Sequence, residues 1–213
     1  MKLIQFIVLV KKPFLFFLRL NIMSMIQKGT IIVNDGSKII GLTGNTDYNV
    51  LVFDPNESSG VRWTSGPKLL MCYNATTEVS IDSGWSDITW DTQVKKDSIY
   101  THSLNSAEVT INEPGFYYVA VDIGTYNSSG SSRSQSIMRF LVDSGSGYSE
   151  IGGTRGSMYN RNSAQGRASA SVNRPIQFMI GDKFKVQAQR SSGTGVILTE
   201  ANACRININK LIE

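Results

Sequence analysis

The sequence predicts an all-β protein, an antiparallel jelly-roll sandwich preceded by a short β-rich neck. Hydrophobic and polar residues alternate along most apolar segments, which is typical of half-buried strands. Turn residues recur at short intervals, with 19 glycines in 213 residues, and no segment shows a helical period. Because 41% of the residues are hydrophobic, the chain can bury a sizeable core.

The alternation is clearest from Pro67 onward. Successive apolar positions there are expected to face one core, because alternate residues of a strand share a face. The residues expected to point inward are Val79, Ile81, Ile88, Trp90, Val109, Ile111, Tyr117, Val119, Val121, Ile137, Phe140, Val142, Ile176, Phe178, Ile180, Phe184, Val186, Ala188, Cys204, Ile206 and Ile208.

The segment 113–124, "EPGFYYVAVDIG", predicts the strongest strand of the chain, starting directly after a Pro-Gly turn. With Tyr117 and Val119 on the core side, Tyr118 and Ala120 lie on the other face. An aromatic and a small residue on that face suit a subunit interface, since tyrosine is favoured where an apolar body meets a polar edge. The alternative is a strand with one half-exposed tyrosine.

The neck, residues 23–66, contains short β-branched runs at 31–33, 38–40 and 50–53, separated by turn residues. It is too short and too polar to bury a core alone, so we expect it to wrap around copies of itself. Its string "NVLVFDPNESSGVRWTSG" resembles segments that precede the globular tip in phage and large-virus fibre proteins; the alternative is an ordinary hairpin anchored by Trp63. The residues that carry the resemblance are Val50, Leu51, Asp54, Gly60, Val61, Trp63 and Ser65.

Three motifs stand out in the head, residues 67–213: a Gly-x-Tyr strand, a late Gly-Asp hairpin with the strand after it, and an apolar closing strand. Their residues are Gly115, Tyr117, Gly181, Asp182, Phe184, Val186, Ile206, Ile208 and Leu211. With these motifs the head resembles the trimeric jelly roll shared by the complement recognition protein's globular head and the tumour-necrosis-factor (TNF) ligands, and the resemblance implies a homotrimer. Val119 stands where that family's strand has a second aromatic, and there is no collagen-like stalk, so a virus-fibre setting fits better than an animal complement relative.

The leader, residues 1–22, is hydrophobic and basic, but Lys11, Lys12 and Pro13 divide its apolar run. Each piece is far shorter than the roughly 20 residues of a membrane-spanning helix. A signal peptide needs a continuous apolar region and a small-residue cleavage site. We interpret the leader as separate from the folded body, with Met23 or Met25 as the start; membrane contact as an anchor or a poor signal is the alternative.

The formal net charge of +4 does not indicate nucleic-acid binding. Five of the 21 basic residues lie in residues 1–28, which contain no acid, and the remaining 16 face 17 acidic residues. The body is therefore close to neutral, with no basic face implied for a nucleic-acid partner.

No catalytic arrangement is visible, and neither a metal nor a cofactor is expected. The single histidine, His102, lies in a polar segment without a Cys-His or Ser-His-Asp pattern, and we interpret it as structural or superficial. Two acidic pairs, Asp54 with Glu57 and Asp82 with Asp87, match no calcium loop and are better explained by turn chemistry.

The two cysteines, Cys72 and Cys204, are too far apart in sequence for a zinc cluster. Two buried free thiols are the first interpretation, and a disulfide between the first and last strands of the head is the second. Glycosylation sequons occur at Asn56, Asn74 and Asn127, and they matter only on a secretory route.

Two stretches, 124–136 and 143–171, are expected to be long loops and to carry any ligand site. Their mixture of Tyr, Ser, Gly, Asn and Arg is typical of adaptable recognition loops, although plain solvated connections are the alternative. The candidate residues for contact with a host-surface glycan or protein are Tyr126, Arg133, Tyr148, Arg155, Tyr159, Arg161 and Arg167.

These observations favour a virion structural protein, namely a fibre, spike or minor capsid component rather than an enzyme. It would assemble as a homotrimer beside other capsid or fibre proteins and attach to a host surface. The alternative is a secreted, extracellular complement-like or lectin-like module unconnected with a virus. A cleaved leader, a glycan on Asn74 and an oxidised Cys72–Cys204 pair would favour that alternative.

Overall fold

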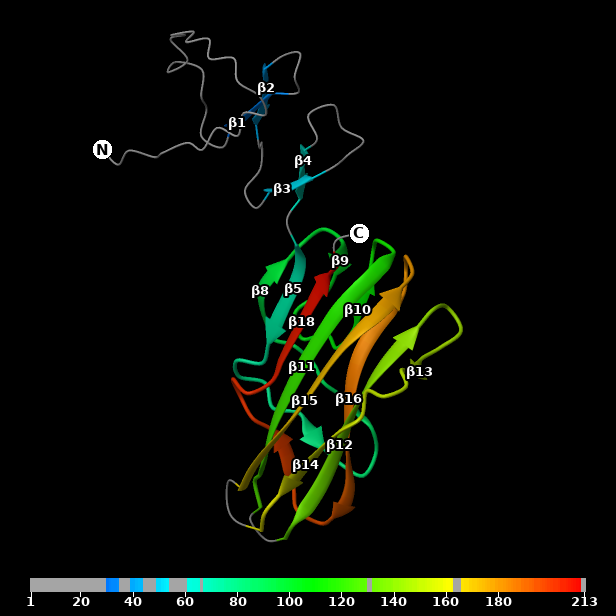
Figure 1. The fold of residues 1–213 in the computed structure, drawn as a ribbon. Coiled ribbons are helices and arrows are strands. Elements are labelled where there is room, and N and C mark those ends of the chain that lie inside the picture. The colour runs from blue at the N-terminus through cyan, green and yellow to red at the C-terminus, as the bar shows by residue number, and fades with distance from the viewer. Residues whose placement is uncertain are drawn as a thin grey trace, which may run out of the picture. The chain divides into compact units, whose positions relative to one another are not determined.

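The computed structural model describes residues 67–129, 132–162 and 166–211 together with four strands before them (Figure 1). The chain divides into two units, Met1–Thr64 and Ser65–Glu213. The second unit begins two residues before the predicted start of the head.

The first unit contains two small sheets. Strands β1 (Thr30–Asn34) and β2 (Ile39–Thr43) pair antiparallel, and β3 (Asn49–Phe53) pairs with β4 (Val61–Ser65). The last strand ends one residue past the unit boundary. The three β-branched runs predicted for the neck thus overlap with β1, β2 and β3. The leader and the neck residues Asp54 and Gly60 lie outside the described residues.

The second unit consists of two seven-stranded sheets. Sheet I has the order β6-β17-β11-β18-β5-β8, with β15 on the other side of β11. Its strands are β5 (Lys68–Tyr73), β6 (Ser80–Ile81), β8 (Thr92–Lys96), β11 (Gly115–Asn127), β15 (Gly166–Phe178), β17 (Ile197–Thr199) and β18 (Arg205–Lys210).

Sheet II has the order β13-β12-β16-β10-β9, with β14 also pairing with β12 and β7 with β16. All its pairs are antiparallel. Its strands are β7 (Ser86–Asp87), β9 (Tyr100–Thr101), β10 (Val109–Ile111), β12 (Ser134–Asp143), β13 (Ser149–Glu150), β14 (Gly156–Asn160) and β16 (Lys183–Gly193).

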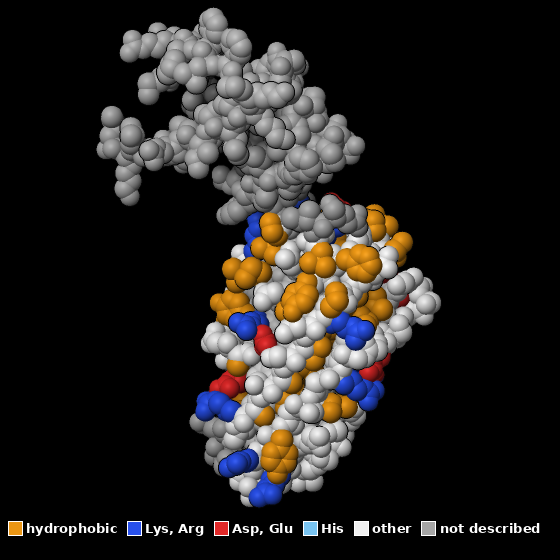
Figure 2. Space-filling model, in the orientation of Figure 1, with side chains coloured by type: hydrophobic (Ala, Val, Ile, Leu, Met, Phe, Trp, Pro, Cys, Tyr) orange, Lys and Arg blue, Asp and Glu red, His pale blue; other side chains and the backbone are white. Residues whose placement is uncertain are grey.

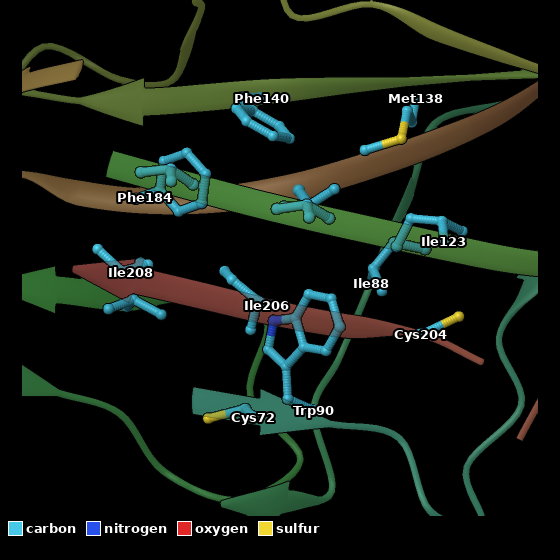
Figure 3. Packing of buried hydrophobic residues seen from close by; sticks show 14 of the residues in the cluster. Cys72, Ile88, Trp90, Ile123, Met138, Phe140, Phe184, Cys204, Ile206 and Ile208 are labelled. Atoms are coloured by element: carbon cyan, nitrogen blue, oxygen red, sulfur yellow. The ribbon is translucent and has the colours of Figure 1, made fainter. Parts of the chain in front are cut away.

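The core lies between the two sheets and follows the predicted alternation. In β11, Tyr117, Val119, Val121 and Ile123 are fully buried, whereas Tyr118 is 43% exposed. Figure 3 shows residues of both sheets meeting there, with Phe140 and Phe184 of sheet II near the strands of sheet I. Burial of so many apolar side chains is the main stabilising contribution to the sandwich.

Aromatic side chains form a connected row through this core. Tyr117 contacts Tyr100 and Phe178 edge-on, with ring centroids 6.0 and 5.6 Å apart, and Phe178 contacts Phe184 at 5.7 Å. The Tyr100 hydroxyl donates to the carbonyls of Lys68 and Ile208. Both buried tyrosines therefore satisfy their polar ends, since the Tyr117 hydroxyl donates to the carbonyl of Glu113 at 2.6 Å.

Two of the expected core positions are wrong. Ile180 is 68% exposed because it lies in the turn between β15 and β16, where Gly181 has a positive φ of 86° and the alternation ends. Ile137 is only half-buried, because β12 buries Ser136, Met138 and Phe140 instead. The segment "SIMRFLV" has apolar residues of both parities, so only pairing with β16 decides which set faces the core.

Candidate functional site

The outer face of sheet I is defined here by the side chains of β15, β11, β18 and β5 that point away from the core. On β11, Phe116 is 50% exposed and Tyr118 is 43% exposed, and Ala120 is half-buried. Tyr118 pairs across the strands with Pro175 on one side and Asn209 on the other. Figure 2 shows hydrophobic side chains gathered over the end of this face where β5 begins and β18 ends.

The middle of the same face is charged rather than apolar. Asp122 accepts hydrogen bonds from Ser171 of β15 and, at 2.5 Å, from the Arg205 guanidinium of β18. Both partners lie opposite Asp122 in the strand register. The larger part of the apolar area on the outer face therefore lies in the half that carries Phe116 and Tyr118.

About half of the residues in the two predicted ligand loops belong to strands, which corrects the interpretation of 124–136 and 143–171 as loops throughout. Strand β11 runs to Asn127, β12 begins at Ser134, and β13, β14 and β15 take up nearly half of the second stretch. Tyr126, Tyr159 and Arg167 therefore lie on strands. Their Gly, Ser and Asn neighbours favour loops locally, but β15 pairs with β11 along 13 residues, and this pairing overrides local propensity.

Four of the seven candidate residues have partners within the head, namely Tyr126, Tyr148, Arg155 and Arg167. Arg155 forms a two-pronged pair with Glu150 at 2.7 and 2.9 Å, and Arg167 contacts Glu200 at 2.5 Å. The hydrogen bond from Arg155 is the largest of the effects that hold the pKa of Glu150 below its usual range. The Tyr148 hydroxyl donates to Glu108 at 2.6 Å, with the Lys185 ammonium 4.2 Å from the centre of its ring.

The end of β11, the start of β12 and the end of β14, which carry or adjoin Tyr126, Arg133, Tyr159 and Arg161, lie at the end of the sandwich opposite to the start of β5 (Figure 1). Tyr126 donates to Glu78 at 2.9 Å. Arg133 and Arg161 each come one residue beyond the last β12–β14 pair, which joins Ser134 to Asn160. Both arginines are exposed, and Tyr159 is 52% exposed. We name Arg133, Arg161, Tyr159 and Gln135, the residue that pairs with Tyr159, the arginine corner.

A buried polar cluster lies beneath the arginine corner and consists of Thr125, Asn127, Ser134 and Asn160, each at most 2% exposed. The Asn160 amide donates to the carbonyl of Gly166 at 3.0 Å and to the Thr125 hydroxyl at 3.2 Å. The Ser134 hydroxyl accepts from the Gly195 amide at 2.8 Å. The cluster therefore holds the turns at this end through hydrogen bonds instead of apolar packing.

The sequence interpretation missed this cluster, although a signal was present. Continuing the inward alternation of β11 past Val121 and Ile123 places Thr125 and Asn127 on the core side. Polar residues at inward positions of a strand must find hydrogen-bond partners, which marks them as candidates for holding loops.

His102 is only 6% exposed, which favours a structural over a superficial histidine. Its Nε2 lies 3.2 Å from the carbonyl of Ser106, and its Nδ1 lies 3.8 Å from the Cys72 sulfur. Because a carbonyl only accepts, Nε2 carries the proton and Nδ1 accepts from the thiol. Burial lowers the pKa of His102, with the nearby charge of Lys96 adding to that effect, and burial raises the pKa of Cys72 to about 11.

Cys72 and Cys204 are free thiols, so the disulfide interpretation is wrong. The Cys204 thiol donates to the carbonyl of Gly124 at 3.3 Å, and burial raises its pKa to about 11. Figure 3 shows the two sulfurs apart, one on β5 and the other just before β18. A buried thiol with a raised pKa is a poor nucleophile.

Two of the three sequons are inaccessible in the folded head. Asn74 and Asn127 are both fully buried. A glycan on either side chain is incompatible with this fold, because its bulk requires a surface position. Asn56 lies outside the described residues.

In the described part of the chain, His, Cys, Asp and Glu form no group of three or more that could hold a metal ion. Asp87 pairs with Lys185 and Gln187, and Asp82 accepts from Ser80. None of the described segments is a helix long and apolar enough to cross a membrane.

Several solved structures are similar to this chain. A crystal structure of murine APRIL at pH 5.0 has a TM-score of 0.50 and 9% identity, over 68% of this chain and 99% of that one. Eiger TNF from S. frugiperda has a TM-score of 0.49 and 15% identity, over 69% and 94%. The globular domain of zebrafish complement 1qA protein has a TM-score of 0.45 and 14% identity, over 68% and 98%.

No protein-family model and no curated protein matches the sequence. The similarity to APRIL is one of fold, and it confirms the predicted all-β, TNF-like jelly roll. Function has to be argued from the surfaces of this chain, because one fold hosts many functions.

Proposed function

We propose that this chain is a homotrimeric attachment protein of a virion, acting as a fibre, spike or minor capsid component. Three heads would join through the outer face of sheet I, with Tyr118 and Ala120 in the interface, and the head would bind a host surface. No catalytic step is included in the proposal. The observation that carries it is the pair of exposed aromatic side chains, Phe116 and Tyr118, on that face.

The apolar end of the outer face supports an assembly role. A soluble monomer gains nothing from leaving two large aromatics half-exposed on a regular sheet, whereas aromatic residues are enriched in the cores of subunit interfaces. Single exposed aromatics are ordinary, but Phe116 and Tyr118 lie two residues apart on one strand and point the same way.

A polar atom beside Tyr118 adds to this argument. Asn209 Oδ1 is buried and has no hydrogen-bond partner among the described residues, and Asn209 pairs directly with Tyr118 across β18 and β11. An unsatisfied buried acceptor costs about 1–3 kcal/mol. Because this oxygen is buried within the single head, a donor from a neighbouring subunit would remove that cost once the side chains over it turn aside.

The virion setting rests on the neck, whose residues resemble the pre-head segments of fibre proteins. The alternative secreted module would gain support from a glycan on Asn74 and an oxidised Cys72–Cys204 pair. The head instead buries Asn74 completely and keeps both thiols free. A capsid gene adjoining the gene for this chain, and labelling of purified particles by an antibody against the head, are the expected results for the virion role.

Assembly is tested by sedimentation equilibrium of the full chain at micromolar concentration. We expect a species of about 70 kDa, three times the chain mass of 23.5 kDa. Tyr118→Arg should shift it to the monomer, because three charges would meet in one interface. Val196→Arg is the matched control, since Val196 is 45% exposed at the other end of the head. A monomeric parent chain would contradict the assembly proposal.

A further inference from the structure

We propose that the arginine corner binds an acidic glycan, with Arg133 and Arg161 pairing with one sulfate or carboxylate group and Tyr159 supporting the adjoining sugar ring. This proposal deepens the attachment part of the proposed function, and it does not depend on the trimer because all four residues belong to one head.

The first argument is that only some of the candidate arginines have a carboxylate partner among the described residues. Arg155 and Arg167 are engaged with Glu150 and Glu200. Arg133 and Arg161 are exposed, and no carboxylate among the described residues forms an ion pair with either of them. Two like charges just beyond the neighbouring ends of β12 and β14 repel each other. An external anion between them would relieve that repulsion.

The second argument is that one buried side chain positions both arginine-bearing segments. The Asn127 amide nitrogen donates to the carbonyl of Ser132 at 2.6 Å and to the carbonyl of Arg161 at 3.0 Å. The Asn127 oxygen accepts from Ser129 at 2.9 Å. The backbone just before Arg133 and the backbone at Arg161 are thus tied to the same amide, so the two side chains start from fixed, neighbouring positions.

A third element fixes Arg133 from the opposite side. Gly193 has a φ of +79°, and a Cβ at this position would overlap the carbonyl oxygen of Arg133. The close approach therefore needs glycine. A site whose supporting shell holds its backbone in place loses little conformational entropy when it binds.

The chemistry of the corner indicates a glycan rather than an acidic protein segment. Guanidinium groups present a planar fork that pairs with two oxygens of a carboxylate or sulfate. Tyr159 and Gln135 lie side by side as cross-strand partners, and both are exposed, as is Ser192 beyond Gln135. Among the described residues, this surface offers one aromatic ring and several hydrogen-bond groups but no aliphatic cluster, which the core of a protein interface normally has.

The test is direct binding of the full chain to three probes, measured by calorimetry at one salt concentration. The probes are a sulfated heparin-derived octasaccharide, sialyllactose as the carboxylate source, and hexaglutamate as an acidic peptide. We expect binding to one or both glycans and weaker binding to the peptide. Tight binding to hexaglutamate alone, or to none of the three, would overturn the proposal.

The arginines are tested by two double variants that remove the same charge. Arg133→Gln with Arg161→Gln should weaken glycan binding about 30-fold, or about 2 kcal/mol. Arg155→Gln with Arg167→Gln should leave it nearly unchanged, because these side chains are already paired. Equal losses in both would mean that only net charge matters and would refute the site.

Two further variants separate the site from folding and from assembly. Tyr159→Ala should weaken glycan binding while leaving the melting temperature nearly unchanged, and unchanged binding would refute the role of the ring. Tyr118→Arg separates glycan binding from assembly. A monomeric variant that still binds the glycan through Arg133 and Arg161 would support the site and show that binding needs no trimer. A parent chain that forms the trimer but does not bind the glycan would overturn this inference and leave the assembly proposal standing.

Discussion

The Asp91 carboxylate holds the first turn of the head, and replacing it tests how strongly that turn depends on one side chain. It follows the buried Trp90 and accepts backbone hydrogen bonds from Ala75, Thr76 and Thr77 at 2.7, 2.9 and 2.7 Å. The hydroxyls of Thr92 and Thr76 add two more, at 2.9 and 3.1 Å. Desolvation raises the pKa of this carboxyl, but the hydrogen bonds outweigh it and hold the pKa well below its usual range.

Asp91→Asn keeps the shape of the side chain and replaces one acceptor oxygen with a donor. If the remaining oxygen serves Thr76 and Thr77, the amide of Ala75 faces another donor and loses its partner, which costs about 1–3 kcal/mol. The other two bonds lose their charge assistance and weaken to about half. We expect a destabilisation of about 3 kcal/mol, which lowers the melting temperature of a domain of this size by about 6–12 °C.

Thermal melts followed by circular dichroism at one protein concentration measure this effect, with Asp82→Asn as the control. Asp82 makes a single side-chain bond, to Ser80 at 3.3 Å, so its variant should melt within about 2 °C of the parent. Because the folded pKa of Asp91 lies below the unfolded value of about 3.9, its stabilisation is present above that pH and lost below it. The gap between parent and Asp91→Asn should therefore narrow below pH 4. Equal melting of the two aspartate variants at pH 7 would refute the reasoning.

Two further predictions concern other buried features. His102 is buried beside Cys72 and Lys96, and its pKa is lowered. The stability that depends on neutral His102 is therefore present above the unfolded pKa of about 6.5 and is lost as the pH falls. Between pH 7.5 and 5 the melting temperature should fall less for His102→Gln than for the parent, and parallel slopes would contradict this. Gly193→Ala should lower the melting temperature by several degrees, because of its positive φ and the overlap with Arg133, whereas Gly84→Ala, with open space around its Cβ, should not; equal melting of both variants would show that the approach is not tight.

The sandwich could be predicted from the sequence because its information is local and periodic. Alternation marked Ile81, Trp90, Phe184 and Ile206 as core, and all four are fully buried. Alternation fails where it stops: Ile180 keeps the pattern of β15 into a turn and is exposed. It is also ambiguous in β12, where apolar residues stand at positions of both parities.

The ligand residues could not be sorted from composition alone. Arg155 and Arg161 are six positions apart and chemically identical, yet Arg155 meets Glu150 on β13 while Arg161 extends past the end of β14 without such a partner. Tyr148 looked available until the fold brought Glu108 and Lys185 against it. Which charges neutralise one another depends on strand register, and register is a property of the pairing between strands distant in sequence.

The sequence by itself determined the class of fold, the inward residues of most strands and the opposite orientations of Tyr117 and Tyr118. It could do so because hydrophobic and polar residues alternate along each strand. Only the tertiary structure decided that Asn74 is buried, that the two thiols stay apart, and that Asn127 joins the segments of Arg133 and Arg161. These outcomes depend on contacts between residues far apart in the chain, and such contacts are fixed only when the two sheets close over their common core.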